Sequence, residues 1–176
     1  MIPFQRDGDS ITASFTTLER RLISDLAASV AELLEPLASH INDDPLFEAT
    51  GIGGSNARHS DPAIARLLPN AHADDEAASA DFRRLTERSL STRKVTNAQA
   101  VLASLDTDSG TVMLDAALVQ SWLRTLADIR LVIASRLGIE SDDDRGTADT
   151  DELVMLRDVY DWLGFVTESL IEALEA

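Results

Sequence analysis

The sequence predicts a mainly α protein, a bundle of about five helices with a small N-terminal β-hairpin. Long stretches space their apolar residues by three or four positions, as a helix with one buried face requires. Residues that start or end helices flank these stretches, and residues 2–15 alternate in polarity around a turn. With 176 residues, 44% of them hydrophobic, the chain is long enough for one core, so we predict a single domain over 1–176.

The first two elements are a hairpin and a helix. Asp7-Gly8 favours a tight turn, and apolar residues alternate after it up to Phe15. The helix is predicted to begin at Thr16, where "TTLE" is typical of a capping box closed by Glu19, and Pro36 should kink or end it. Its inward face is predicted to hold Leu18, Leu22, Leu26, Val30, Leu33 and Leu37.

The next segments are a loop and two helices. Residues 39–60 lack a sustained period and predict a long loop, whereas Asp61-Pro62 is a typical start for the short helix "PAIARLL". A longer helix follows Asp74 and Asp75, and its two halves place their apolar residues on opposite sides. It either breaks near residues 91–96 or is one rod with different neighbours at its ends; the lack of Gly or Pro favours the rod. The two apolar groups are Phe82 and Leu85, beside Ser89, and Ala98, Val101, Leu102 and Leu105.

The C-terminal part predicts a third strand and two helices. "TVML" suits a short strand, Asp115 a helix cap, and Gly138-Ile139 a Schellman-type end. The helix between them is predicted to bury Val119, Trp122, Leu126, Ile129, Ile133 and Leu137. The last helix, after Asp149, carries apolar residues around about half its circumference, which exceeds the stripe of an ordinary surface helix. It is therefore either central in the bundle or a subunit interface, the second case predicting a homodimer.

Composition excludes several classes of function. The formal net charge of -16 repels nucleic acid and anionic membranes, so neither is an expected partner. No cysteine occurs, and the three histidines lack the spacing of metal ligands, so no metal or other cofactor is expected. "HADDE" reads as a helix start rather than a cation site, and "GIGG" lacks the ending of a phosphate loop. The absence of a leader or membrane segment favours the cytoplasm.

Two charges fall on apolar helical faces. Arg130 lies among the apolar residues of its helix, and Glu19 lies within the leucine stripe of the first helix. Because a buried charge needs a partner, we predict that Glu19 and Arg130 form a structural ion pair across the two helices. The alternative is that Arg130 anchors an anion in a pocket.

The segment "ADFRRLTERSLSTRK", residues 80–94, concentrates positive charge in an acidic chain. One interpretation is internal neutralisation by carboxylates of the same fold. The other is a patch that recognises an acidic peptide, a phosphate or another protein through the bidentate geometry of arginine. The cationic residues are Arg83, Arg84, Arg88, Arg93 and Lys94, and the candidate binding residues are Arg83, Arg84, Arg88, Lys94 and Arg130.

Two stretches resemble a known family. "SDPAIARLLPNAHADDEAASADFRRLTERSLSTRK" and "QSWLRTLADIRLVIASRLGI" resemble the actinobacterial family catalogued as domain of unknown function 2017, and the resemblance covers nearly the whole chain. It implies a small, mainly helical, cytoplasmic protein, often encoded beside the adaptor of the Clp protease, which hints at proteostasis. It carries over no catalytic residues.

These observations favour a non-enzymatic regulatory or protein-interaction module whose partner is another protein. No catalytic constellation can be assembled from the motifs. The alternative is a protein or enzyme that binds a small anionic ligand in an arginine-lined pocket centred on Arg130 and the arginines of residues 80–94.

Overall fold

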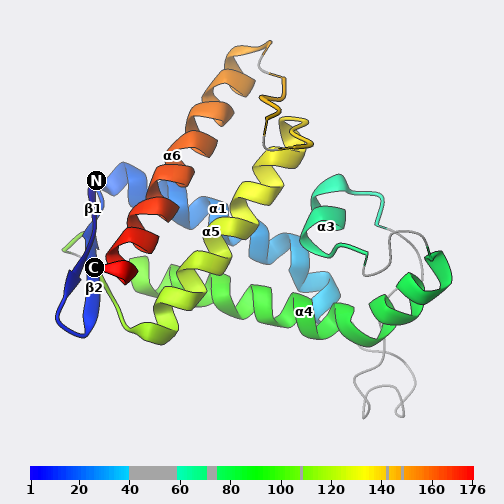
Figure 1. The fold of residues 1–176 in the computed structure, drawn as a ribbon, viewed down its shortest axis with the longest axis horizontal. Coiled ribbons are helices and arrows are strands. Elements are labelled where there is room, and N and C mark those ends of the chain that lie inside the picture. The colour runs from blue at the N-terminus through cyan, green and yellow to red at the C-terminus, as the bar shows by residue number, and fades with distance from the viewer. Residues whose placement is uncertain (40–58, 71–74, 108, 142, 148) are drawn as a thin grey trace.

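The computed structural model describes residues 1–39, 59–70, 75–107, 109–141, 143–147 and 149–176, except for the side chains of Glu76 and Arg84. The fold is mainly α with a small sheet, as the sequence predicted (Figure 1). The described helices and strands are β1 (Ile2–Asp7), β2 (Ser10–Ser14), α1 (Thr17–Ala38), α3 (Pro62–Leu67), α4 (Glu76–Leu105), β3 (Thr111–Leu114), α5 (Ala116–Arg136) and α6 (Asp151–Glu175).

The predicted hairpin is part of a three-stranded antiparallel sheet in the order β1-β2-β3. Gly8 takes a positive φ of 62° in the turn, a conformation that glycine adopts without steric cost. The "TVML" segment forms the predicted third strand beside β2. Alternate residues of the sheet, such as Ile11 and Ala13, are buried against the helices, which explains why the hairpin is stable.

The helices form two crossed pairs (Figure 1). α1 and α4 run side by side in opposite directions, and α5 and α6 rise across them as a second antiparallel pair. α3 lies beside the later part of α5. The C-terminal end of α6 reaches β1, where the Arg6 Nη2 donates a hydrogen bond to the Leu174 carbonyl at 2.8 Å. The sheet therefore lies at one end of the molecule and α3 nearer the other.

Trp122 organises the core at the sheet end. Its side chain is fully buried, stacked on Phe15 with ring centroids 5.8 Å apart and edge-on to Phe4 at 5.5 Å. Its indole Nε1 donates to Ser104 Oγ on α4 at 3.0 Å, so the polar atom of this large residue is satisfied. One residue thus joins β1, the end of β2, α4 and α5.

Helix α1 has the predicted start, but its inward face differs. Thr16 is the N-cap, the capping box with Glu19 is present, and Pro36 lies within the last turn. Leu18 is 78% exposed, and the other predicted leucines are only partly buried. The residues that α1 buries fully are Ile23, Ala27, Val30 and Leu34. The buried face is therefore rotated by about one residue from the predicted one, and Val30 is the residue that the two faces share.

Helix α4 is one continuous rod, and the interpretation of two opposite inward faces was wrong. Phe82 and Leu85 are 40% and 52% exposed, so they do not mark an inward side. The buried residues follow one face along the whole helix: Ser79, Arg83, Glu87, Ser91, Val95, Ala98, Val101 and Leu105. The first half of this face is polar, which hydropathy could not identify as buried.

The central helix of the bundle is α5, whereas the sequence had suggested the last helix, α6, as one candidate for that position. α5 buries all six predicted residues, touches α1, α3, α4 and α6, and ends in a Schellman motif at Gly138. α6 packs mainly on α5 and β1, so it is not the centre of the bundle. Its first half is poorly covered, with Val154 47% and Met155 69% exposed, because it rises away from the α1–α4 layer.

Several sequence-based expectations fall on undescribed residues. These include most of the predicted loop at 39–60, with His40 and "GIGG", and the start of "HADDE" with His72 and Asp74. Asp75 is described and caps α4, its side chain accepting from the Ala78 N–H at 2.9 Å. Within the described part of the chain, no helix is long and apolar enough to cross a membrane.

Candidate functional site: an arginine-lined pocket

A cavity of about 730 Å³ lies between α3, the later part of α5, the first half of α6 and residues 139–141 and 144–146. This volume is within the range of small-molecule sites. Leu131, Ala134 and Ile139 give it an apolar wall. Its cationic groups come from four separate segments: Arg66, Arg130, Arg145 and Arg157.

The segment after α5 forms one wall of the pocket and is held firmly in place. The Thr147 N–H donates to the Leu137 carbonyl at 2.8 Å. Gly146 has a positive φ of 59°, and a Cβ there would lie 2.2 Å from the Leu137 carbonyl oxygen. Only glycine fits this conformation and this space, so the wall depends on Gly146.

Asp144 closes the same wall through its carboxylate. Its two oxygens accept hydrogen bonds from the Gly146 N–H at 2.8 Å and the Glu140 N–H at 3.0 Å. These two backbone bonds, with a smaller contribution from Arg157, lower the pKa of Asp144 from its usual value. Asp144 is therefore ionised near neutral pH, but its oxygens serve the backbone of the loop.

Arg130 projects from α5 towards α6. The guanidinium carbon lies 4.5 Å from the ring centroid of Tyr160, a cation–π contact. A Cβ built on Gly164 would lie at an ordinary van der Waals distance, 3.8 Å, from the same guanidinium group, so the arginine also packs against this part of α6. The intrusion of Arg130 on an apolar face is thus explained by a contact with α6.

Two other arginines border the loop wall. Arg66, at the end of α3, donates through Nη2 to the Ile139 carbonyl and ties α3 to the end of α5. The Nη2 atom of Arg157 lies beside Gly146, 3.1 Å from the position of a Cβ there. Both side chains are partly buried, whereas Arg145 is exposed at the mouth.

The positive charge of the pocket is incompletely compensated. Three carboxylates also line it, those of Glu140, Asp144 and Asp161. Among the residues that the structure describes, no ion pair within 4.0 Å joins any of them to the four arginines. Arg130 Nε and Arg157 Nε and Nη2 are buried without a hydrogen-bond partner. Such groups are unusual in folded proteins, and they leave the positive charge of Arg130 and Arg157 without a compensating acceptor from the protein.

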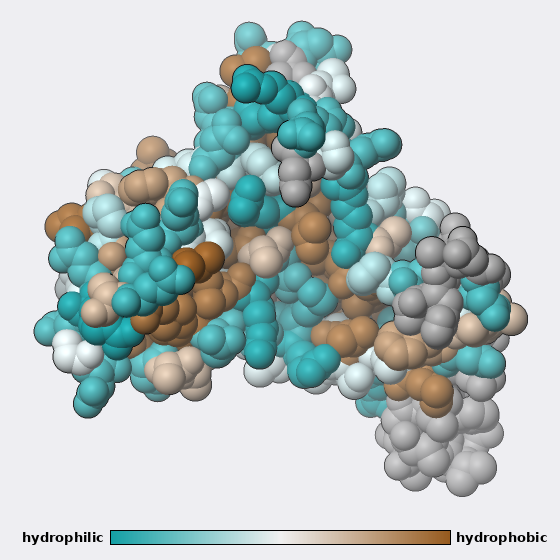
Figure 2. Space-filling model, viewed as in Figure 1, coloured by the Kyte–Doolittle hydropathy of each residue, from teal (hydrophilic) through white to brown (hydrophobic). Residues whose placement is uncertain are grey.

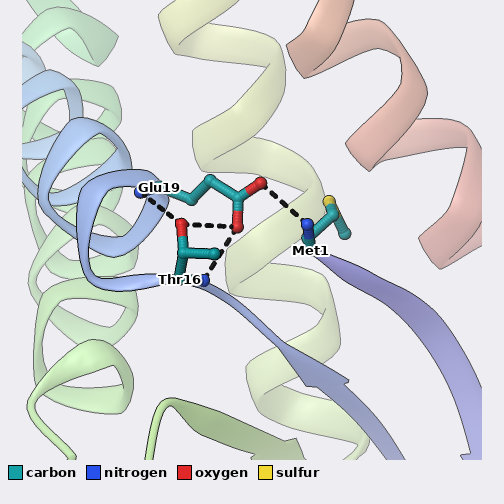
Figure 3. A network of polar contacts seen from close by, with 3 residues as sticks. All are labelled: Met1, Thr16 and Glu19. Atoms are coloured by element: carbon teal, nitrogen blue, oxygen red, sulfur yellow. Dashed lines mark hydrogen bonds and ion pairs between the residues drawn. The ribbon is translucent and has the colours of Figure 1, made fainter.

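The predicted ion pair between Glu19 and Arg130 is not formed. Glu19 accepts from the Met1 ammonium at 2.8 Å, and from the N–H and hydroxyl of Thr16 at 2.8 and 3.0 Å (Figure 3). Burial works against ionisation, but the Met1 ammonium and the Thr16 bonds outweigh it and lower the pKa of Glu19. The Met1 ammonium, at the start of β1, is therefore the cation that pairs with Glu19 in place of Arg130.

The cationic residues of α4 are not gathered into one surface. Arg83 is buried and donates to Asn70 Oδ1, and Lys94 forms an ion pair with Asp128 of α5. Arg88 is partly buried, Arg93 is exposed, and the side chain of Arg84 lies outside the described residues. The ion pair with Asp128 is internal neutralisation of Lys94, whereas the Asn70 acceptor of Arg83 is a neutral amide.

The Lys94–Asp128 ion pair is largely buried. The side chain of Asp128 is 5% exposed and that of Lys94 22%. Burial raises the pKa of Asp128 above its usual value, although Lys94 acts in the opposite direction. The second carboxylate oxygen, Oδ2, has no hydrogen-bond partner. The interaction with Lys94 therefore compensates only part of what burial costs the ionised carboxylate.

The described residues also bear on metal binding. They contain no group of three or more His, Asp or Glu side chains arranged to hold a metal ion. His59 Nε2 instead lies 2.8 Å from Glu87 Oε2, joining the segment before α3 to the buried face of α4.

Fold and site together define a mainly α protein, acidic overall, with one end of its α5–α6 pair built around an arginine-lined pocket. The family model of domain of unknown function DUF2017 matches residues 1–174. The chain belongs to this family, as its sequence suggested.

Relatives with a named role are mycobacterial. The chain is 28% identical over 183 aligned residues to the oxidative stress regulator AosR of Mycobacterium tuberculosis and of Mycobacterium bovis, covering 96% of this chain and 84% of each relative. It is 29% identical to the putative oxidative stress regulator AosR of Mycobacterium leprae, covering 90% of this chain and 79% of the relative. No solved structure matches the chain.

Proposed function

We propose that the protein is a regulator of the response to oxidative stress, acting by binding other molecules rather than by catalysis. The similarity to named oxidative stress regulators, along 96% of the chain, carries this proposal. The regulatory character expected from the sequence agrees with it, and the cytoplasm is the compartment where such a regulator would act.

The amino-acid composition limits how oxidants can act on this regulator. The chain has no cysteine, so its own residues offer no thiol for reversible oxidation. Any response of this chain to oxidants must then come through a bound partner, a bound ligand or another side chain. This favours binding as the central activity of the protein.

The proposed partner is a protein, and α6 carries the surface to test. Val154, Met155 and Phe165 are 47%, 69% and 50% exposed on this helix. Figure 2 shows brown apolar surface among teal polar residues on the face that α5 and α6 present. Apolar residues ringed by charge are common at regulated protein contacts.

The role in oxidative stress is tested in the native host. A deletion strain should survive hydrogen peroxide less well than the parent and recover when the gene is returned. Equal survival of the deletion strain and the parent under peroxide, and under an oxidant of another class, would refute the proposed role.

The role of α6 is tested by partner capture and light scattering. The V154D/M155D double variant should lose a protein that the wild-type chain captures, while L18D, which alters an exposed leucine of α1, should retain it. Light scattering on purified wild-type protein distinguishes a second copy of the chain from a different protein as the partner. Capture that is unchanged in the double variant would place the partner elsewhere.

A further inference from the structure

The pocket at the end of the α5–α6 pair has no assigned ligand. It combines concavity, apolar surface and four arginines, which is unusual in a chain whose net charge is -16. We propose that this pocket binds a small phosphorylated molecule, whose phosphate contacts Arg130 and Arg157 and whose remaining part lies against Leu131 and Ile139.

The charge of the pocket selects for an anion. No described carboxylate forms an ion pair with its arginines, and three of their buried nitrogens have no hydrogen-bond partner. Arginine donates two parallel hydrogen bonds to a phosphate, and several arginines together match its charge better than that of a single carboxylate. A phosphate in the pocket would accept hydrogen bonds from the guanidinium nitrogens that face the cavity, and its charge would also balance that of the three buried nitrogens.

The remaining lining favours a ligand with more than a phosphate. The volume of about 730 Å³ greatly exceeds that of one inorganic ion. Glu140 and Asp161 line the same cavity and are available to accept hydrogen bonds from hydroxyl or amino groups. Leu131, Ala134 and Ile139 offer apolar contact. A phosphorylated metabolite with a hydroxylated or planar body has all three features.

The overall charge favours a small ligand over an acidic protein segment. A protein partner rich in carboxylates would meet the negative field of the whole chain during approach. The electrostatic energy of a small ligand inside the pocket depends mainly on the nearest guanidinium groups, because salt screens charges beyond about 8 Å at physiological ionic strength. The loop wall fixed by Gly146 and Asp144 gives the cavity a defined shape before binding.

The experiment measures binding by purified wild-type protein at constant ionic strength. The probes are inorganic phosphate, a sugar phosphate, a nucleoside monophosphate, and the unphosphorylated sugar and nucleoside. We expect saturable binding of at least one organic phosphate, about tenfold tighter than that of inorganic phosphate or of its unphosphorylated counterpart. An acidic peptide and a phosphoserine peptide are tested alongside.

The variants are R130Q/R157Q and the matched control R21Q/R93Q, which removes two exposed arginines from α1 and α4. The first should weaken binding by about tenfold or more, and the control should leave it within about twofold. Circular dichroism and thermal unfolding without ligand verify that both variants fold. If R130Q/R157Q does not fold, R145Q, at the exposed mouth of the pocket, replaces it and should weaken binding about threefold.

Three outcomes would overturn the proposal. They are no saturable binding of any phosphorylated probe, equal weakening by the pocket and control variants, and a peptide that binds more tightly than every small phosphate. The measurement uses purified protein and no oxidant, so its failure is distinguishable from failure of the proposed role in oxidative stress.

Discussion

The two ends of helix α4 bury one face of the same helix in different surroundings. At the sheet end, Val101 and Leu105 join an apolar core around Trp122. At the α3 end, the same face buries Ser79, Arg83 and Glu87. The buried face of α4 thus passes from an apolar interior to a polar one, and its two ends should respond differently to mutation.

The sheet end should give the largest effect. Trp122→Ala removes a fully buried side chain that contacts Phe4 and Phe15 and bonds to Ser104. We expect a loss of about 3–5 kcal/mol in the free energy of unfolding, because the cavity cannot be refilled by three separate elements. Urea titration measures it, and a loss below about 1 kcal/mol would show that the two ends do not differ as described.

Between the ends, the Lys94–Asp128 pair should respond asymmetrically. Lys94→Met leaves a buried carboxylate without its cation and should cost up to about 3 kcal/mol. Asp128→Asn should be neutral or stabilising near neutral pH, because burial raises the pKa of Asp128 and disfavours its charged form, while Lys94 retains access to solvent.

The pH dependence of the same pair has a definite sign. The folded pKa of Asp128 is above its unfolded value of 3.8, so ionisation costs stability at neutral pH. That cost disappears as the pH falls through the folded pKa to below 3.8. The advantage of Asp128→Asn over the wild type should therefore shrink on acidification, and an advantage that grows would contradict the assignment.

The α3 end should give a smaller loss with a different cause. Glu87→Gln keeps the shape of the side chain but removes the charge that faces His59 at 2.8 Å. We expect a loss of about 1.5–3 kcal/mol, the range for a hydrogen bond with one charged partner. Chemical denaturation of Glu87→Gln and Glu87→Leu separates the contribution of the charge from that of burial. If the surroundings of this end of α4 were apolar, Glu87→Leu would be more stable than Glu87→Gln.

The contrast between the two ends also explains what the sequence could predict. Helix α5 was predicted in start, end and buried face because Asp115, Gly138 and its apolar period act locally. The first half of α4 was misread because a buried Arg83 and Glu87 have the hydropathy of a surface. A local pattern cannot show whether a polar residue faces solvent or is buried against a partner that another segment of the chain supplies.

The candidate pocket was predictable only in part. Arg130 stood out because it interrupts an apolar face, and an arginine-lined pocket around it was one expectation. Arg66, Arg145 and Arg157 belong to three other segments and reach the same cavity through the packing of α3 and α6 on α5. The arginines of residues 80–94 were expected there instead, because they cluster in the sequence, whereas the packing that brings separate segments together cannot be seen in it.

The smallest expected effect on stability comes from a change at Glu19. This carboxylate is partly buried, and its pKa is shifted in the direction opposite to that of the buried Asp128. The Met1 ammonium and the Thr16 bonds lower its folded pKa below 4.5, so its ionised form adds stability above that pH, and this stability is lost as the pH falls through the folded pKa. Glu19→Gln should cost about 1 kcal/mol near neutral pH, typical of a lost helix cap. Thermal unfolding from neutral to acidic pH should show the gap between wild type and Glu19→Gln closing as Glu19 is protonated. If the stability advantage of the wild type over Glu19→Gln instead grew towards acidic pH, burial would destabilise ionised Glu19 as it does Asp128. The partners of the two carboxylates would then not explain why their pKa values shift in opposite directions.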